Sequence, residues 1–279
     1  MNRVAVSARM VAQEILRNTT AVSLLFLVPT ILYGLIRATT GENLVPFQLS
    51  ADRGVILTGS ERTLSLLFMG STAMCGLMAF LSLVLTWRPI QTDRRLVFEG
   101  FPPAALLGAK ILVVAAASTI MALYVTGLLL FFYHPPRLGG VFLGFFLGGL
   151  IYGLIGIVLG ILSRRELDGI LAILLLVNVD PGWLQNPVFY AGAHNRAIID
   201  WLPAHHPCQL TLLSVFTEKS LLPELLLCGG WLLACGLVAA LGYRWRIGIE
   251  RPRGAAQART TSRDSSFNHP NPEKNRNAK

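Results

Sequence analysis

The sequence predicts an all-α polytopic membrane protein with six transmembrane helices, an N-terminal amphipathic helix and a re-entrant outer segment between spans five and six. Three observations support this fold class: 53% of the residues are apolar, only 14% are charged, and the apolar residues form long uncharged runs. The mean hydropathy is +0.56. A soluble chain of this length needs more surface charge to stay in solution, so the runs indicate helices that cross a bilayer.

Five of the runs are long enough to cross a membrane, which takes about 20 residues of helix. They are Asn18–Ile36, Thr63–Trp87, Ile111–Pro136, Leu138–Ser163 and Leu225–Tyr243. A sixth run, Gly169–Val179, is too short to cross alone. Because Leu167 and the neutral stretch after Pro181 flank it, we expect a span that breaks on its outer side.

The distribution of basic residues predicts the orientation of these spans. Most Lys and Arg residues of the apolar region fall in the segments that share one side with both termini. By the positive-inside rule, both termini are then cytoplasmic, in a plasma (cytoplasmic) membrane, and the number of spans is even. Orientation also explains the net charge of +9, so no nucleic acid is expected as a partner. Ser7 should be cytoplasmic, and Thr58 and Gln185 should be exposed outside.

The chain divides into three expected parts. Residues 1–19 form an interfacial amphipathic helix, or alternatively a frayed leader, residues 20–243 form the six-span domain, and residues 244–279 form a disordered cytoplasmic tail. The domain includes an inner segment, 88–110, and an outer segment, 180–224. The stripe of the first helix comprises Val4, Ala8, Val11, Ala12 and Ile15.

The fourth apolar run is rich in glycine at helical spacing. Its three small-xxx-small pairs are Gly144 with Gly148, Gly149 with Gly153, and Gly156 with Gly160. Such pairs let helix backbones approach closely in lipid. Packing within one subunit and a helix that slides or lines a transport path both remain open.

Several catalytic motifs are absent from the sequence. It has no G-x-x-x-x-G-K-[ST] phosphate loop, no HExxH zinc motif and no G-x-S-x-G elbow, so the chain is not expected to be an enzyme or to hold a cofactor or metal. No charged residue is expected near the middle of a span. Ion-coupled transporters usually keep such residues there, so the energy source is expected outside the bilayer.

One cluster resembles metal ligands. His205-His206-Pro207-Cys208 lies in the expected outer segment, but a third ligand at defined spacing is missing. A polar interfacial turn and a heme or copper role both fit these residues. The four cysteines show no paired spacing, which indicates neither a disulfide framework nor a zinc site.

The inner segment 88–110 mixes charged and large apolar residues. Its charged residues are Asp93, Arg94, Arg95 and Glu99, and its apolar residues are Leu96, Val97, Phe98 and Phe101. Gly100 and Pro102-Pro103 are expected to end a short helix. That helix either inserts into a groove on a partner protein or anchors a loop among lipid headgroups.

This segment resembles the cytoplasmic loop of type-2 ATP-binding cassette exporter permeases. The matching positions are Arg94-Arg95, Leu96–Phe101, Pro102-Pro103 and Leu107-Gly108-Ala109-Lys110, with Trp201-Leu202-Pro203 and His206-Pro207 echoing a later turn of the family. The resemblance implies ATPase-coupling roles for Arg94, Arg95, Leu96, Phe98, Glu99 and Phe101. It departs at Arg95, where the family carries an acidic residue, and Glu99 is the candidate replacement.

The resemblance implies a permease subunit of an exporter that moves a hydrophobic or amphipathic substrate, such as a drug, an antibiotic or a lipid. Its partners would be a cytoplasmic ATP-binding cassette ATPase subunit, a second permease subunit in a homo- or heterodimer, and membrane lipid. Two alternatives stay open: a membrane-embedded enzyme or heme- or metal-handling protein that uses His205 and His206, and a scaffold without a transport role.

Overall fold

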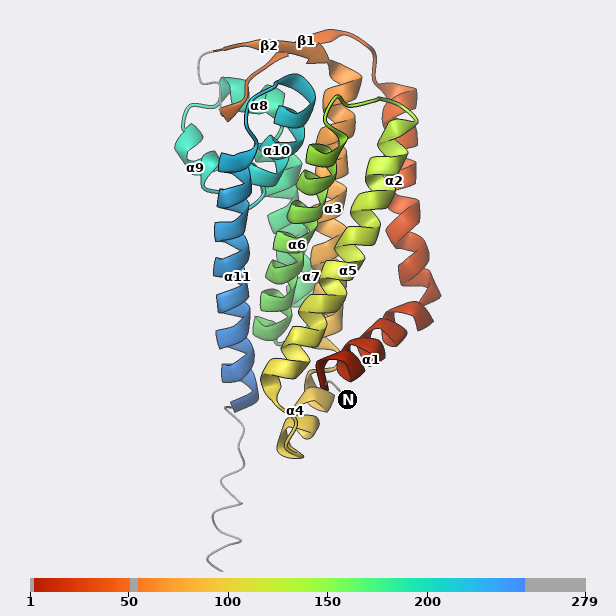
Figure 1. Cartoon of the computed structure of the whole chain (residues 1–279), viewed down its shortest axis with the longest axis vertical. Helices are drawn as coiled ribbons and strands as arrows, with labels where there is room; N and C mark the ends of the chain where they lie inside the picture. The colour runs from red at the N-terminus through yellow and green to blue at the C-terminus, as the bar shows by residue number, and fades with distance from the viewer. Residues whose placement is uncertain (1–2, 51–54, 249–279) are drawn as a thin grey trace, which may run out of the picture.

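The computed structural model describes residues 3–50 and 55–248. The helices that precede the outer segment are α1 (Arg3–Arg17), α2 (Thr19–Thr39), α3 (Glu61–Trp87), α4 (Ile90–Phe98), α5 (Pro103–Leu130), α6 (Leu138–Leu162) and α7 (Glu166–Val179). They are followed by the π-helical turn η2 (Asp180–Leu184), α8 (Pro187–Gly192), α9 (Arg196–Asp200), α10 (His205–Phe216) and α11 (Leu222–Gly248). Within the described residues, six helices are long and apolar enough to cross a membrane: α2, α3, α5, α6, α7 with η2, and α11. This confirms the expectation of a multi-pass, six-helix membrane protein (Figure 1).

The glycine-rich helix α6 lies at the centre of the bundle. It packs against α3, α5, α10 and α11. A methyl group added at Gly156 would meet the backbone of Ala79 on α3, and one at Gly153 would meet Val114 on α5. Gly144 faces α10 just as closely. The glycine pairs therefore pack inside this one chain, which is the first of the two alternatives the sequence left open.

Helices α2 and α11 lie at the outside of the bundle. Their apolar windows are only 17% buried, against 61% for α3 and α6. Leu24, Leu27 and Ile31 on α2 and Leu233 and Leu237 on α11 are all at least 48% exposed. Such apolar surfaces fit contact with lipid tails, where they need no protein partner.

The fifth candidate span, Glu166–Leu184, changes from α-helix to π-helix near its end. The α-helix α7 ends at Val179, and the chain continues through Pro181 as the π-helical turn η2 before it leaves the helical path. The backbone N–H of Gln185 donates to the backbone carbonyl oxygen of Asp180 at 3.2 Å. This bond joins residues five positions apart, as in a π-helix. Pro181 lacks an N–H, and the wider turn accommodates it.

A small β-hairpin covers one end of the bundle and was not predicted. Strands β1 (Leu44–Phe47) and β2 (Leu57–Ser60) pair antiparallel, with Leu44 opposite Ser60 and Phe47 opposite Leu57. Phe47 is fully buried and meets Phe216 of α10 edge to face, with ring centroids 4.7 Å apart. The hairpin therefore forms a cap over α10 (Figure 1).

Helix α1 packs obliquely against α5 at the opposite end of the bundle (Figure 1). Ala8, Val11, Ala12 and Ile15 of its predicted stripe contact the bundle core. Ser7 lies on the same side and is only 7% exposed. The first described residues, α4 and the last turn of α11 all lie at this end of the molecule (Figure 1).

Two boundaries differ from the sequence expectation. Helix α5 begins at Pro103, a residue suited to the first helical turn, so it starts before the apolar run Ile111–Pro136 and includes Lys110. Helix α11 runs to Gly248, so residues 244–248 of the expected tail are helical. The rest of that tail lies outside the described residues.

Candidate functional site

The predicted inner helix exists as α4, and a glycine ends it. Gly100 has a φ of 92°, in the left-handed region where residues with a Cβ are strained. The Phe101 amide donates to the Leu96 carbonyl at 2.9 Å, and the Gly100 amide donates to the Val97 carbonyl at 3.1 Å. This pair of bonds is a Schellman motif, which stops the helix and turns the chain toward α5.

The two faces of α4 have different surroundings. Ile90 and Asp93 are buried against the bundle. Arg95, Phe98 and Glu99 are exposed, and Phe98 is 55% exposed despite its large apolar ring. The outward face of α4 therefore presents one aromatic side chain between a cation and an anion.

A buried ion pair ties α4 to the bundle. Asp93 accepts from the ammonium of Lys110 on α5 at 2.8 Å, and the hydroxyl of Tyr243 on α11 donates to the same carboxylate oxygen at 2.8 Å. Lys110 is 1% exposed and also donates to the Leu85 carbonyl of α3 at 2.8 Å. Asp93 and Lys110 thus join four helices at one point.

Arg94 and Arg246 extend this connection. A guanidinium nitrogen of Arg94 donates to the backbone carbonyl of Arg246 at 3.2 Å. Arg246 lies in the last turn of α11. The Arg246 guanidinium in turn donates to the carbonyls of Ile161 and Ser163 at the end of α6. A displacement of α4 would therefore act on α5, α6 and α11 through side-chain bonds.

The predicted coupling residues separate into two groups. Leu96 and Phe101 pack against the core of their own chain, and Arg94 bonds to α11. Phe98, Arg95 and Glu99 are the members left on the surface. In this structure the second group presents more of its surface to a partner protein than the first, whose members are partly buried.

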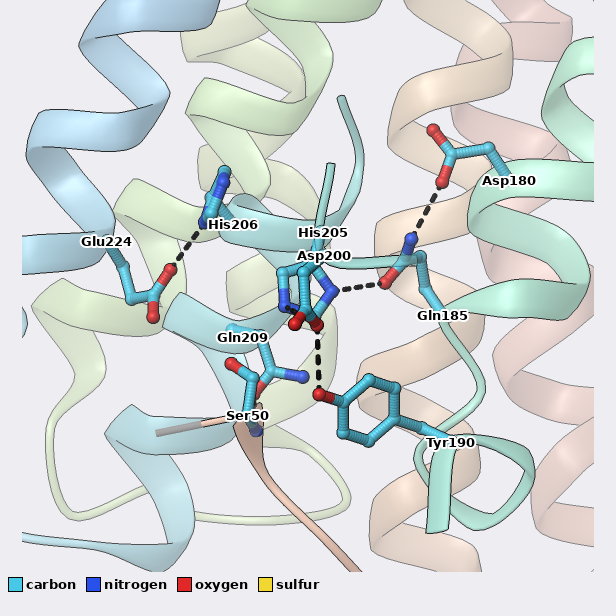
Figure 2. A network of polar contacts seen from close by, with 9 residues as sticks. All are labelled: Ser50, Asp180, Gln185, Tyr190, Asp200, His205, His206, Gln209 and Glu224. Atoms are coloured by element: carbon cyan, nitrogen blue, oxygen red, sulfur yellow. Dashed lines mark hydrogen bonds and ion pairs between the residues drawn. The ribbon is translucent and has the colours of Figure 1, made fainter. Parts of the chain in front are cut away.

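A second polar network lies at the opposite end of the bundle and includes Asp180, which Figure 2 shows bonded to Gln185. Asp180 is 1% exposed. It accepts from the Tyr152 hydroxyl of α6, from the Gln185 amide nitrogen at 2.8 Å and from the Ala204 backbone N–H at 3.1 Å. These bonds satisfy the buried carboxylate and attach the end of the fifth span to α6 and to the turn before α10.

His205 continues the network. Its Nδ1 lies 2.9 Å from the Gln185 side-chain oxygen, and its Nε2 lies 3.3 Å from an Asp200 carboxylate oxygen (Figure 2). The Tyr190 hydroxyl donates to the same Asp200 oxygen at 2.9 Å. Both ring nitrogens face oxygen acceptors, so a doubly protonated His205 would satisfy both contacts.

His206 faces a different helix. Its Nδ1 lies 2.7 Å from a Glu224 carboxylate oxygen on α11, and its ring is nearly perpendicular to that of His205 (Figure 2). Gln209, one turn further along α10, accepts from the Ser50 amide at 3.2 Å. His205, His206 and Gln209 of α10 therefore each contact a different neighbouring segment.

The arrangement does not resemble a metal centre. Among the described residues, no group of three His, Cys, Asp or Glu side chains is placed to hold a metal ion. Burial, with Asp180 nearby, raises the pKa of the Cys208 thiol, which disfavours the thiolate that a metal would need. In this structure His205 contacts Gln185 and Asp200, and His206 contacts Glu224.

The sequence did not reveal either set of buried charges. The sequence predicts Asp93 in a short helix and Lys110 at the start of the third span, but it gives no sign that the two side chains pair inside the bundle. Asp180 was placed in the outer segment, although it directly follows an apolar run. The expectation that Gln185 is exposed is wrong, because its amide is enclosed between Asp180 and His205 and the residue is 3% exposed.

Comparison with known proteins adds no relative. No protein-family model matches the sequence. No curated protein matches it either.

Proposed function

We propose that this chain is the transmembrane subunit of an ATP-driven exporter, with ATP hydrolysed by a separate cytoplasmic ATP-binding cassette subunit that docks on α4. One observation carries the proposal: α4 projects from the bundle with Phe98 outward, while Asp93 and Arg94 bond it to α5 and α11. A helix that transmits force between a partner and a bundle needs both properties.

The proposal gives roles to other segments. The side of the bundle that holds α4 and both described ends is cytoplasmic, α1 lies in the inner interface, and α8 to α10 form the re-entrant outer segment. A second permease subunit, identical or similar, completes the path. The substrate is hydrophobic or amphipathic and leaves the cytoplasm or inner leaflet.

Phe98 is the anchor to test. Truncating an aromatic side chain that is buried at an interface typically costs about 2–4 kcal/mol, or roughly 30- to 1000-fold in affinity. We expect tagged wild-type protein, purified from its native membranes, to carry vanadate-sensitive Mg-ATP hydrolysis. Phe98→Ala should lose that activity while its level in the membrane is unchanged.

Phe131 provides the matched control, because it is 84% exposed and follows α5 at the opposite end of the bundle. Phe131→Ala should retain the associated ATPase. If wild type carries no ATPase, or if Phe98→Ala and wild type carry equal amounts, α4 is not a docking helix and the exporter proposal fails.

A further inference from the structure

An apolar groove with a polar mouth opens between α2 and α3. Its volume is about 460 Å³, within the range of roughly 300–1,000 Å³ typical of small-molecule sites. Ala21, Leu25 and Val28 of α2 form one wall, and Leu77 and Leu81 of α3 are among the residues that form the other. Ala21 and Val28 are seven positions apart, about 10 Å along the helix, so the groove is elongated.

The polar residues of the groove gather at one end. Glu14 of α1, Asn18 before α2 and Arg88 after α3 line its mouth, at the end of the bundle that holds α4. A molecule in the groove would therefore have its polar part at the membrane surface and its apolar part between α2 and α3. This distribution fits an amphiphile.

The charges at the mouth determine which class of amphiphile the groove would bind. Arg88 donates through two nitrogens to one Glu166 oxygen, at 3.2 and 3.0 Å, so its charge is already balanced. Lys110, which interacts electrostatically with Glu14, is paired with Asp93. Glu14 is exposed and forms no hydrogen bond or ion pair among the described residues. Of the two charged residues that line the groove, Arg88 is thus held by Glu166, and Glu14 offers a carboxylate with no described ion pair, while Arg17 lies three residues further along α1 outside the lining.

We propose that the groove binds an amphiphile with a protonated amine head and a long apolar tail. The ammonium would pair with Glu14, and the tail would lie along α2 and α3. Charge-assisted pairs are the stronger class of hydrogen bond, and the apolar walls favour a hydrocarbon tail. An anionic head would meet Glu14 and find Arg88 already held by Glu166. Binding does not rest on the proposed function, but identifying this amine as the exported cargo does.

Photo-crosslinking tests the site directly. The probe is a long-chain primary amine with a diazirine in its tail, added to the purified full chain in nanodiscs of neutral lipid. We expect crosslinked peptides from the part of α2 around Leu25 and the part of α3 around Leu81. The same probe with an alcohol head should label these peptides about tenfold less, because it cannot pair with Glu14.

Two isosteric variants separate the carboxylate from general effects. Glu14→Gln keeps the shape of an exposed side chain, so the chain should fold normally, and labelling should fall about tenfold. Glu218→Gln, an exposed acid on the loop before α11, should leave labelling unchanged. Equal labelling of Glu14→Gln and wild type, equal labelling by amine and alcohol probes, or labelling spread over α7 and α11 would each overturn the proposal. None of these labelling results depends on an ATPase, so they test the groove independently of the exporter proposal.

Discussion

At the residue scale, the buried pair of Asp93 and Lys110 is the most consequential feature that the sequence concealed. The sequence predicts Asp93 in a short helix and Lys110 at the start of the next span, and a pair separated by 17 positions leaves no local pattern. Burial of a charge requires a partner, and here the partner lies on another helix. Local spacing could predict that α4 forms but not which of its charges turn inward.

Lys110→Met should therefore destabilise the protein strongly. It leaves the Asp93 carboxylate buried with only the Tyr243 hydroxyl, and breaking a buried pair typically costs about 3–5 kcal/mol. The double variant Asp93→Leu with Lys110→Met should recover much of the loss. Thermal unfolding followed by size-exclusion chromatography in detergent measures both, and a double variant no better than the single one would contradict the pair's role.

His205 and His206 should differ in their contribution to stability. His205→Ala removes a 1% exposed ring and leaves Gln185 and Asp200 without that contact, whereas His206→Ala breaks one bond at a side chain that is 12% exposed. Each unsatisfied buried group costs about 1–3 kcal/mol, so His205→Ala should have the lower melting temperature. Elemental analysis of the purified protein should show no stoichiometric metal that either variant removes.

At the scale of elements, the six apolar runs predicted the spanning helices well, because bilayer thickness fixes helix length. The hairpin of Leu44–Phe47 with Leu57–Ser60 was missed, because its strands are four residues each and their stability comes from Phe47 packing on α10. The packing of the glycines of α6 could be suspected from their spacing. The helices against which these glycines pack could not be predicted, because the spacing does not identify α3 as the partner.

Glycine positions on α6 offer a matched test of that packing. Gly156→Ala places a methyl group against the backbone of Ala79, which cannot move aside without shifting α3, so we expect a loss of about 1–3 kcal/mol. Gly139→Ala, on the same helix, meets nothing within 4 Å and should be neutral or slightly stabilising. Equal melting temperatures for the two variants would show that close α3–α6 contact does not limit stability.

At the scale of the whole molecule, the six spans place α4 and the hairpin at opposite ends, and the charge bias predicts which end is cytoplasmic (Figure 1). The exposure of individual residues indicates which positions suit a labelling test of this orientation. Ser7 and Gln185 suit labelling poorly because both are buried, whereas Thr58 on β2 and Gln91 on α4 are exposed. All four native cysteines are free and buried, so new cysteines can be read in an otherwise unchanged chain.

We expect Thr58→Cys to react with a membrane-impermeant maleimide in intact cells, and Gln91→Cys to react only after lysis. The wild-type chain should remain unlabelled in both conditions, because its thiols are enclosed by the bundle. Labelling of Gln91→Cys in intact cells would invert the orientation and place α4 outside, where no cytoplasmic ATPase could reach it. The same result would move Glu14 and the mouth of the groove to the outer leaflet, so the measurement determines both the proposed docking helix and the side from which an amphiphile enters.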